Sequence, residues 1–265
     1  MKKIILLFIF CSSVAFAQKT SYKKSLSGIK KVRVESDASI SIIAGSTSEL
    51  VMTEVGKDGK DRFPRFDRND EKKDRKKGLR PIYPGGEDNT NGFGFSVTTE
   101  NGVLTITDLK SHFQRNNIKI TLPKNMNIDI DSGNLGHILI DGFTSEVEAN
   151  SNVGEIDLKN VTGPVTAHSS TGTITVIFDT VSQSSPISIS SSVGEIDVAL
   201  PSNTKADLNV RTNGTVYTNF NFKAAPKKGL RNVSGLKNIQ KAINGGGVNI
   251  KLKSSMGNIY LRKKE

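Results

Sequence analysis

The sequence predicts an all-β chain, built as a single-stranded β-helix or β-solenoid of short coils of about 20 residues. Three observations predict this class. A glycine followed by an alternating apolar strand recurs along the second half of the chain, a second short strand precedes most of these glycines, and the first half contains strand-like runs without a segment of helical period. An antiparallel β-sandwich of similar strands is the alternative that alternation alone leaves open.

The repeated unit is a glycine with apolar residues at the second and fourth places after it, as in the Gly-Glu-Ile-Asp-Leu of residues 154–158. The steps between successive glycines are 18, 18, 22, 20 and 43 residues, close to the period of solenoid proteins. A pair of short strands cannot bury its apolar side alone, so coils must stack on one another. The glycines that open these units are Gly136, Gly154, Gly172, Gly194, Gly214 and Gly257.

The second strand of each coil lies upstream of the glycine at a constant distance. Four of these strands have an apolar residue five places before the glycine: Ala149, Ala167, Ile189 and Leu252. We therefore expect one turn geometry throughout, with Ser, Thr and Asn forming local hydrogen bonds and Gly permitting an unusual φ.

Alternation decides which side chains meet when the coils stack. One inner stack is predicted to contain Ile138, Ile156, Ile174, Ile196, Val216 and Ile259. A second is predicted to contain Ile140, Leu158, Val176, Val198, Thr218 and Leu261. Two outer rows facing solvent are predicted from His137, Glu155, Thr173, Glu195, Thr215 and Asn258, and from Leu139, Asp157, Thr175, Asp197, Tyr217 and Tyr260.

The first half of the chain continues the same β character less regularly. Strands are predicted at residues 32–34, 40–42, 50–52, 103–106 and 118–122. Together with the repeats they define one β-repeat domain over residues 26–263, preceded by a flexible segment at 18–25.

The first 17 residues predict a secretory signal peptide. Lys2 and Lys3 precede an apolar run at residues 4–10, and Ala15-Phe16-Ala17 has the small-residue pattern of a cleavage site. The run is too short to cross a bilayer, which needs about 20 residues, so we expect no transmembrane segment after cleavage. Cys11, the only cysteine, leaves with this segment, and the mature chain can form no disulfide. The chain is therefore expected to be exported.

The net charge of +11 is concentrated in two insertions, at residues 57–94 and 223–243. Residues 57–80 hold eleven basic and six acidic side chains and predict a solvated loop, whereas apolar residues spaced by three or four in the second insertion favour a short helix or covering flap. Clustered cations attract polyanions, so these insertions are the candidate binding site. Its residues are Lys72, Lys73, Arg75, Lys76, Lys77, Lys227, Lys228 and Arg231.

Candidate catalytic groups are few. His112, His137 and His168 are the only histidines and are scattered, and no metal-ligand pair or serine nucleophile motif is present. The sequence thus predicts no catalytic residues, no metal and no cofactor. Two weaker hypotheses remain: a calcium site from Asp129, Asp131 and Asp141, and a polysaccharide-active lyase or glycosidase that uses outer carboxylates. Those carboxylates are Glu155, Asp157, Glu195 and Asp197.

The repeat motifs resemble a known family. Ser-Asn-Val-Gly-Glu-Ile-Asp-Leu (151–158), Ser-Ser-Val-Gly-Glu-Ile-Asp-Val (191–198) and the closing Asn-Gly-Gly-Gly-Val-Asn-Ile-Lys-Leu-Lys-Ser-Ser-Met-Gly-Asn-Ile-Tyr-Leu (244–261) are similar to the bacterial β-strand-repeat family named putative adhesins. The resemblance extends over roughly residues 120–263. It implies a β-helix related to the head domain of auto-transporter adhesins, and it supplies no catalytic residues.

These observations predict an exported, non-enzymatic, adhesin-like protein of the periplasm, the cell surface or the medium. The expected partner is an anionic polysaccharide, another envelope component or a surface protein. Export argues against nucleic acid as the partner of the basic insertions. A polysaccharide-active enzyme is the alternative function.

Overall fold

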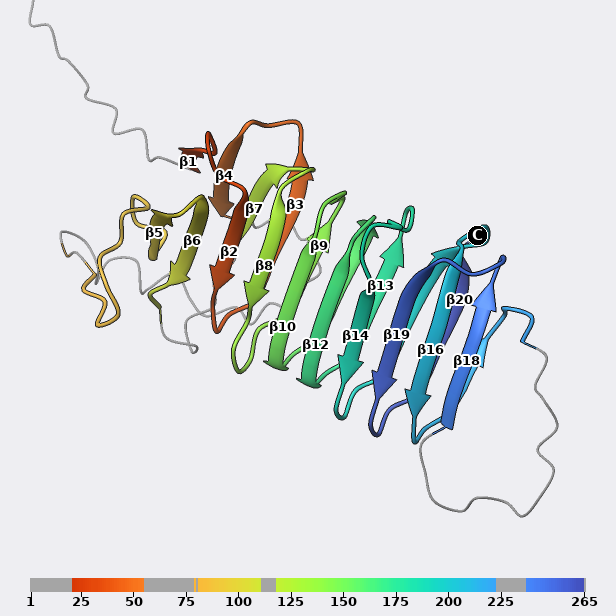
Figure 1. Cartoon of the computed structure of the whole chain (residues 1–265). Coiled ribbons are helices and arrows are strands. Elements are labelled where there is room, and N and C mark those ends of the chain that lie inside the picture. The colour runs from red at the N-terminus through yellow and green to blue at the C-terminus, as the bar shows by residue number, and fades with distance from the viewer. Residues whose placement is uncertain (1–20, 55–78, 80, 111–117, 223–236, 265) are drawn as a thin grey trace, which may run out of the picture.

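The computed structural model describes residues 21–54, 79, 81–110, 118–222 and 237–264. These residues form two ten-stranded sheets that face each other, and the described part of the chain contains no helix. Figure 1 shows the strands of one sheet side by side across the front of the molecule, from β5 and β6 at one end to β16 and β18 at the other. The prediction of an all-β chain is confirmed.

The sheet in front, sheet B, has the spatial order β18 (Lys237–Ile243), β16 (Ala206–Thr212), β19 (Val248–Ser254), β14 (Ile187–Ser191), β12 (Val165–Thr171), β10 (Val147–Val153), β8 (Asn127–Asp131), β2 (Lys31–Glu35), β6 (Val103–Asp108) and β5 (Phe95–Glu100). The sheet behind it, sheet A, has the spatial order β1 (Ser21–Ser25), β4 (Glu49–Glu54), β7 (Ile118–Pro123), β3 (Ile40–Gly45), β9 (Ile138–Asp141), β11 (Ile156–Val161), β13 (Ile174–Phe178), β15 (Ile196–Pro201), β20 (Ile259–Lys264) and β17 (Val216–Thr218).

From β8 to β15 the chain alternates between the two sheets, and each strand pairs in parallel with the strand of the next coil. A coil consists of a strand of sheet B followed by the next strand of sheet A. Two facing sheets are a feature of a sandwich, and parallel winding from sheet to sheet is a feature of a solenoid. The structure joins features of both predicted architectures.

The predicted inner stacks lie between the sheets except at the edge strand β17, where Val216 is half-buried and Thr218 is exposed. Ile138, Ile156, Ile174, Ile196 and Ile259 are in register and completely buried, and the row two residues further along the strands is equally buried from Ile140 to Leu261. Because neighbouring strands are parallel, equivalent residues of each coil pack directly on one another. The apolar positions of the repeat therefore form one continuous core.

Glycine recurs at these positions for a different physical reason from the one predicted. None of the six has a positive φ; instead, each lies against the backbone of the neighbouring coil. A Cβ added at Gly172 would overlap the carbonyl oxygen of Gly154, and one at Gly194 would overlap that of Gly172. Glycine is needed because the coils approach too closely for any side chain.

A row of buried hydroxyls accompanies this glycine row. Ser169 Oγ donates to the carbonyl of Gly154 (3.2 Å), Ser191 Oγ to that of Gly172 (3.2 Å) and Ser254 Oγ to that of Gly194 (2.8 Å). Each of these serines stands three residues before the glycine of its own turn. A buried carbonyl without a hydrogen-bond partner would destabilise the fold, so each turn needs a serine hydroxyl at this position. The predicted local bonds are present as well, because Gly194 N donates to Ser191 Oγ (2.7 Å) and Gly257 N to Ser254 Oγ (2.8 Å).

The order of the coils at the C-terminal end differs from the expected one. The coil β19/β20 lies between β14/β15 and β16/β17, so that Gly257 packs on Gly194 and Gly214 on Gly257. The N-terminal end is similar, because the coil β2/β3 lies between β6/β7 and β8/β9. Antiparallel strands complete both ends: β5, β4 and β1 at one, and β18 at the other.

Two predictions of local structure need correction. Residues 21–25, expected to be flexible, form β1 and pair with β4. In the second insertion, residues 237–243 form β18 instead of a helix, because β16 presents an edge whose backbone groups pair with them. In the first insertion, Phe93 is buried; Asp88 accepts hydrogen bonds from Thr90 N (2.8 Å) and Gly94 N (2.9 Å) and so fixes the loop over the core. Residues 1–17 and most of residues 57–80 lie outside the described part.

Candidate functional site

The four outer carboxylates of sheet A are placed as the sequence predicted. β13 lies between β11 and β15, so Thr173 and Thr175 separate the two Glu-Ile-Asp motifs. The backbones that carry Glu155 and Glu195 are therefore two strand spacings apart, about 9.6 Å. This separation alone fits a pair of inverting glycosidase carboxylates.

Their partners do not favour catalysis. His137 Nε2 lies 3.4 Å from Asp157 Oδ2, and this hydrogen bond lowers the pKa of the Asp157 carboxyl although burial opposes the shift. Glu195 Oε1 accepts hydrogen bonds from Asn258 Nδ2 (3.0 Å) and Tyr260 Oη (3.2 Å), and Asp197 pairs with Arg262 through two bonds of 2.7 and 2.8 Å. A general acid must hold a proton near neutral pH, whereas Asp157 is held ionised. Asp157, Glu195 and Asp197 are engaged by close internal contacts, whereas the Glu155 side chain is 64% exposed and lies 3.8 Å from His137 Nδ1.

The candidate metal ligands are not brought together. Asp129 and Asp131 lie on sheet B and Asp141 on sheet A, on opposite sides of the core. His137 and His168 are separated in the same way, and His112 lies outside the described residues. Within the described ranges no group of three or more His, Cys, Asp or Glu side chains is arranged to hold a metal ion.

The outer face of sheet B carries an acidic depression at its N-terminal half. Five carboxylates line this acidic patch: Glu35, Asp37, Asp108, Asp129 and Asp131. The volume is about 550 Å³, in the range of small-molecule sites, but the depression is open and its lining is charged. It is a surface feature and not an enclosed pocket.

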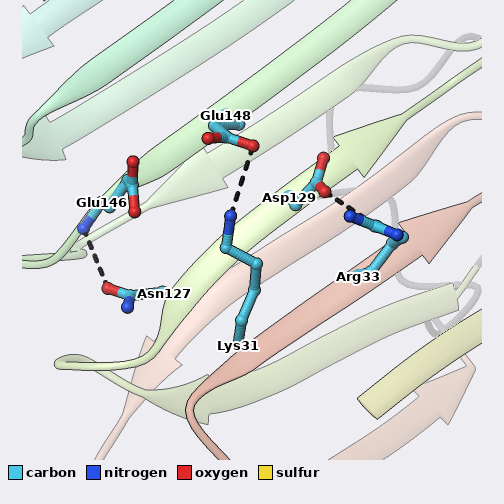
Figure 2. Close-up of polar contacts among 6 residues, drawn as sticks. All are labelled: Lys31, Arg33, Asn127, Asp129, Glu146 and Glu148. Atoms are coloured by element: carbon cyan, nitrogen blue, oxygen red, sulfur yellow. Dashed lines mark hydrogen bonds and ion pairs between the residues drawn. The ribbon is translucent and has the colours of Figure 1, made fainter. Parts of the chain in front are cut away.

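The cations of this half already have carboxylate partners. Figure 2 shows Arg33 Nε bonded to Asp129 Oδ2 (2.8 Å) on β8, the neighbouring strand, and Lys31 Nζ bonded to Glu148 Oε2 (3.4 Å) on β10, the strand beyond β8. The Arg33–Asp129 pair follows from the register, because parallel strands bring outer side chains of successive strands into rows. Lys31 instead reaches diagonally across β8 to Glu148, which lies in the row of Asp129. On this half Lys31 and Arg33 are paired within the protein, and carboxylates are in excess.

The opposite half of the same face carries a basic patch. His168, Ser188, Ser190, Lys251 and Lys253 line a second, smaller depression, and Arg211 lies in register with Lys253 on the next strand. No acidic side chain lines this depression. His168 Nδ1 lies 2.9 Å from Ser190 Oγ, so the imidazole and hydroxyl groups form one polar row that leads to Lys253.

The cations of the basic patch differ from Lys31 and Arg33 in their ion pairing. Lys251, Lys253 and Arg211 form no ion pair with any residue that the structure describes, and the buried Nε of Arg211 has no hydrogen-bond partner there. The lysines are exposed on β19. An unpaired charge next to solvent interacts with external ions, so this patch can attract an anionic ligand.

The charge is therefore distributed differently from the prediction. Residues 199–264 contain thirteen basic residues and a single acidic one, Asp207, so the C-terminal strands are basic as well as the insertions. Alternation along residues 248–253 is enough to predict that Lys251 and Lys253 point outward. Their position beside Arg211 could not be predicted, because it depends on the unexpected strand order. The predicted binding residues Lys72, Lys73, Arg75, Lys76, Lys77, Lys227, Lys228 and Arg231 lie outside the described residues.

Comparison with known proteins gives limited similarity. No family model and no curated protein matches the chain. A putative cell adhesion protein from Clostridium sporogenes is 13% identical, with a TM-score of 0.46 over 92% of this chain and 99% of that one. A putative adhesin from Bacteroides fragilis is also 13% identical, with a TM-score of 0.33 over 92% of this chain and 96% of that one. The relation to auto-transporter head domains stays a prediction.

Proposed function

We propose that this protein is an exported, non-enzymatic, adhesin-like protein that binds an anionic polysaccharide or another anionic component of the cell envelope through its basic patch. The observation that carries the proposal is the difference between the two halves of the sheet B face. Arg33 and Lys31 are paired with carboxylates, whereas Lys251, Lys253 and Arg211 have no ion pair among the described residues.

The shape of the patch favours a polymer over a small molecule. Its depression holds about 210 Å³, less than a typical small-molecule pocket, and it opens along rows of side chains that cross several strands. Hydroxyl groups of Ser188 and Ser190 lie beside the lysines and can bond to sugar hydroxyls or anionic oxygens. An extended chain with repeated negative charges can use several of these groups at once and release bound counterions.

The role as an adhesin also depends on export. The described residues contain no helix long and apolar enough to cross a membrane. The signal peptide at residues 1–17 is the sequence feature that supports export, and an exported protein meets anionic envelope polymers. The basic insertions would extend the contact beyond the patch.

Binding to fluorescent polygalacturonate tests the proposal. We expect Lys251→Gln/Lys253→Gln to weaken binding about tenfold or more, because each cation near an anionic surface contributes about 1 kcal/mol. Lys119→Gln/Lys124→Gln is the matched control: it removes the same charge from exposed positions away from the patch and should retain most of the affinity. Equal losses in the two variants would show that net charge, and not the patch, governs binding.

The contribution of the insertions has its own test. Deleting residues 57–80 should weaken adsorption to an anionic matrix further and lower the salt concentration at which the protein elutes. Unchanged elution would remove this insertion from the binding surface and leave the patch as the binding site.

A further inference from the structure

Charged side chains on the outer face of sheet B follow an order across the sheet. Seven parallel strands lie side by side here in the order β2, β8, β10, β12, β14, β19 and β16, with β12 in the middle (Figure 1). Their register places one outward-facing residue of each strand in a single row, which is acidic at one end and basic at the other. The row contains Glu35, Asp131, Asn150, His168, Ser190, Lys253 and Arg211.

A second row lies two residues earlier along the same strands. It contains Arg33, Asp129, Glu148, Thr166, Ser188, Lys251 and Asn209. The carboxylates of this row lie on one side of β12 and its lysine on the other, and Arg33, the cation on the acidic side, is paired with Asp129. β8 and β19 are each the second strand from β12, and β2 and β16 are each the third. Opposite charges thus lie at equal distances from β12 and at the same level along the strands: Glu35 and Arg211, Asp131 and Lys253, and Asp129 and Lys251.

The charged groups at both ends of the first row lack ion pairs. Glu35, Asp131, Lys253 and Arg211 form none with the residues that the structure describes. The first three are exposed, and the buried Nε of Arg211 has no hydrogen-bond partner in the described part of the chain. Each end of this face can therefore attract a surface of opposite charge.

We propose that the outer face of sheet B is the contact surface of a dimer in which two copies of this chain are related by a twofold axis along β12. This axis places β8 of one copy over β19 of the other, and β2 over β16. Because the axis runs parallel to the strands, every residue keeps its level along them. Asp131 therefore faces Lys253 of the partner subunit, and Glu35 faces Arg211 of the partner subunit. Asp129 faces Lys251 of the partner subunit in the second row.

The symmetry makes this face complementary to itself. Both copies present the same surface, so every opposing charge pair occurs twice. Two sheets that pack face to face keep their strands within about 30° of each other, as an axis along β12 requires. The middle strands, β12 and β14, contribute Thr166, His168, Ser188 and Ser190 to the two rows and no carboxylate, lysine or arginine. The centre of the contact thus brings no acidic groups together.

The size of the face predicts a weak dimer. Seven strands are about 29 Å across and five residues of a strand are about 17 Å long, so each copy would cover about 500 Å². Stable complexes cover about 800 Å² per partner. The net charge of +11 opposes association, but at physiological salt repulsion is largely screened beyond about 8 Å. We therefore expect a reversible dimer at micromolar to millimolar protein concentrations.

Sedimentation velocity of the full mature chain and of two charge-reversed variants tests the proposal. Wild type should show a monomer–dimer equilibrium at physiological salt. Lys251→Glu/Lys253→Glu places carboxylates opposite carboxylates, and Asp129→Lys/Asp131→Lys places lysines opposite lysines, so each should raise the dissociation constant at least about tenfold. An equimolar mixture of the two variants should form a heterodimer with about the wild-type dissociation constant, because every acidic group then faces a basic one.

The matched control is Lys23→Glu/Lys119→Glu, which makes the same change of charge at exposed positions of sheet A and should dimerise like wild type. Circular dichroism checks the fold of every variant. Glu35→Lys/Asp131→Lys, which spares the pair of Arg33 with Asp129, replaces the acidic-end variant if the latter does not fold. The mixture would then pair it with Lys253→Glu/Arg211→Glu.

A wild-type chain that stays monomeric overturns the proposal, as does a charge-reversed variant that dimerises like wild type or a mixture that stays monomeric. A monomer would also result if the acidic end binds a cationic partner other than this chain. Polygalacturonate binding separates this inference from the proposed function: a monomeric wild type that still binds the polymer through Lys251 and Lys253 would overturn the dimer alone.

Discussion

The central coils, from β8 to β15, and the C-terminal strands, from β16 to β20, use the same building unit but differ in order and in charge. The central coils follow one another in chain order, and their acidic side chains are largely engaged by neighbours such as Arg33, Lys31 and His137. Among the C-terminal strands the last coil lies between earlier ones, and the sheet B side carries unpaired cations. The repeated coils thus form the scaffold. The surface that we propose to bind ligands lies where the order of the strands in the sheet departs from their order in the chain.

Replacing the stacked glycines by alanine tests whether the two regions are packed equally tightly. A Cβ at Gly172 would overlap the carbonyl of Gly154, and one at Gly257 would overlap that of Gly194. We expect Gly172→Ala and Gly257→Ala each to lower the free energy of unfolding in urea by about 3 kcal/mol. Gly28→Ala is the control: φ is +77° with open space around it, and the cost should be about 1 kcal/mol. A loss at Gly257 as small as at Gly28 would mean that the last coil is not seated between β15 and β17.

Removing one charge from each half of the sheet B face should give unequal changes in stability. Asp129→Asn leaves Arg33 without its partner and should lower the free energy of unfolding by up to about 1 kcal/mol, an effect that high salt reduces. Lys253→Gln should change it by less than about 0.5 kcal/mol, because no described ion pair is lost. Urea unfolding at low and high salt measures both. A larger loss for Lys253→Gln would show that this lysine has an internal partner after all.

Acid titration tests whether the internal contacts of the carboxylates in the central coils stabilise the protein. The hydrogen bond from His137, against the opposing effect of burial, lowers the pKa of Asp157. A carboxyl with a lowered folded pKa stabilises the protein above its unfolded pKa of about 3.9, and this stabilisation is lost as the pH falls through the folded value. Asp157→Asn should therefore flatten the decrease in thermal midpoint over this acidic range, and His137→Gln should flatten it similarly. An unchanged pH profile in both variants would contradict the assignment.

Much of the fold could be predicted from the sequence because one physical pattern repeats. Alternation around the glycines predicted both inner stacks except at β17, where Thr218 is exposed, and the strand order from Gly136 to Gly194 follows from near-constant spacing. The pattern could not distinguish a glycine that needs a positive φ from one pressed against a neighbouring carbonyl, since both appear as Gly in a turn. The structure shows the second case for all six repeats.

The candidate sites were less predictable, because they depend on order along the sheet. Val216 and Ile259 fit the same stack, and nothing in their local sequence tells which lies beside Ile196. Only the inserted position of β19 brings Lys253 between Ser190 and Arg211. The predicted basic clusters in the insertions are contiguous in sequence, whereas the basic patch is assembled from distant strands.

The salt dependence of polygalacturonate binding tests the central claim most directly. Binding through unpaired cations releases counterions, so the logarithm of the affinity should fall linearly with the logarithm of the NaCl concentration. We predict that Lys251→Gln/Lys253→Gln lowers this slope by about 1 to 2 and that Lys119→Gln/Lys124→Gln leaves it nearly unchanged. Identical slopes for wild type and the Lys251→Gln/Lys253→Gln variant would contradict the claim that the C-terminal strands form the binding surface.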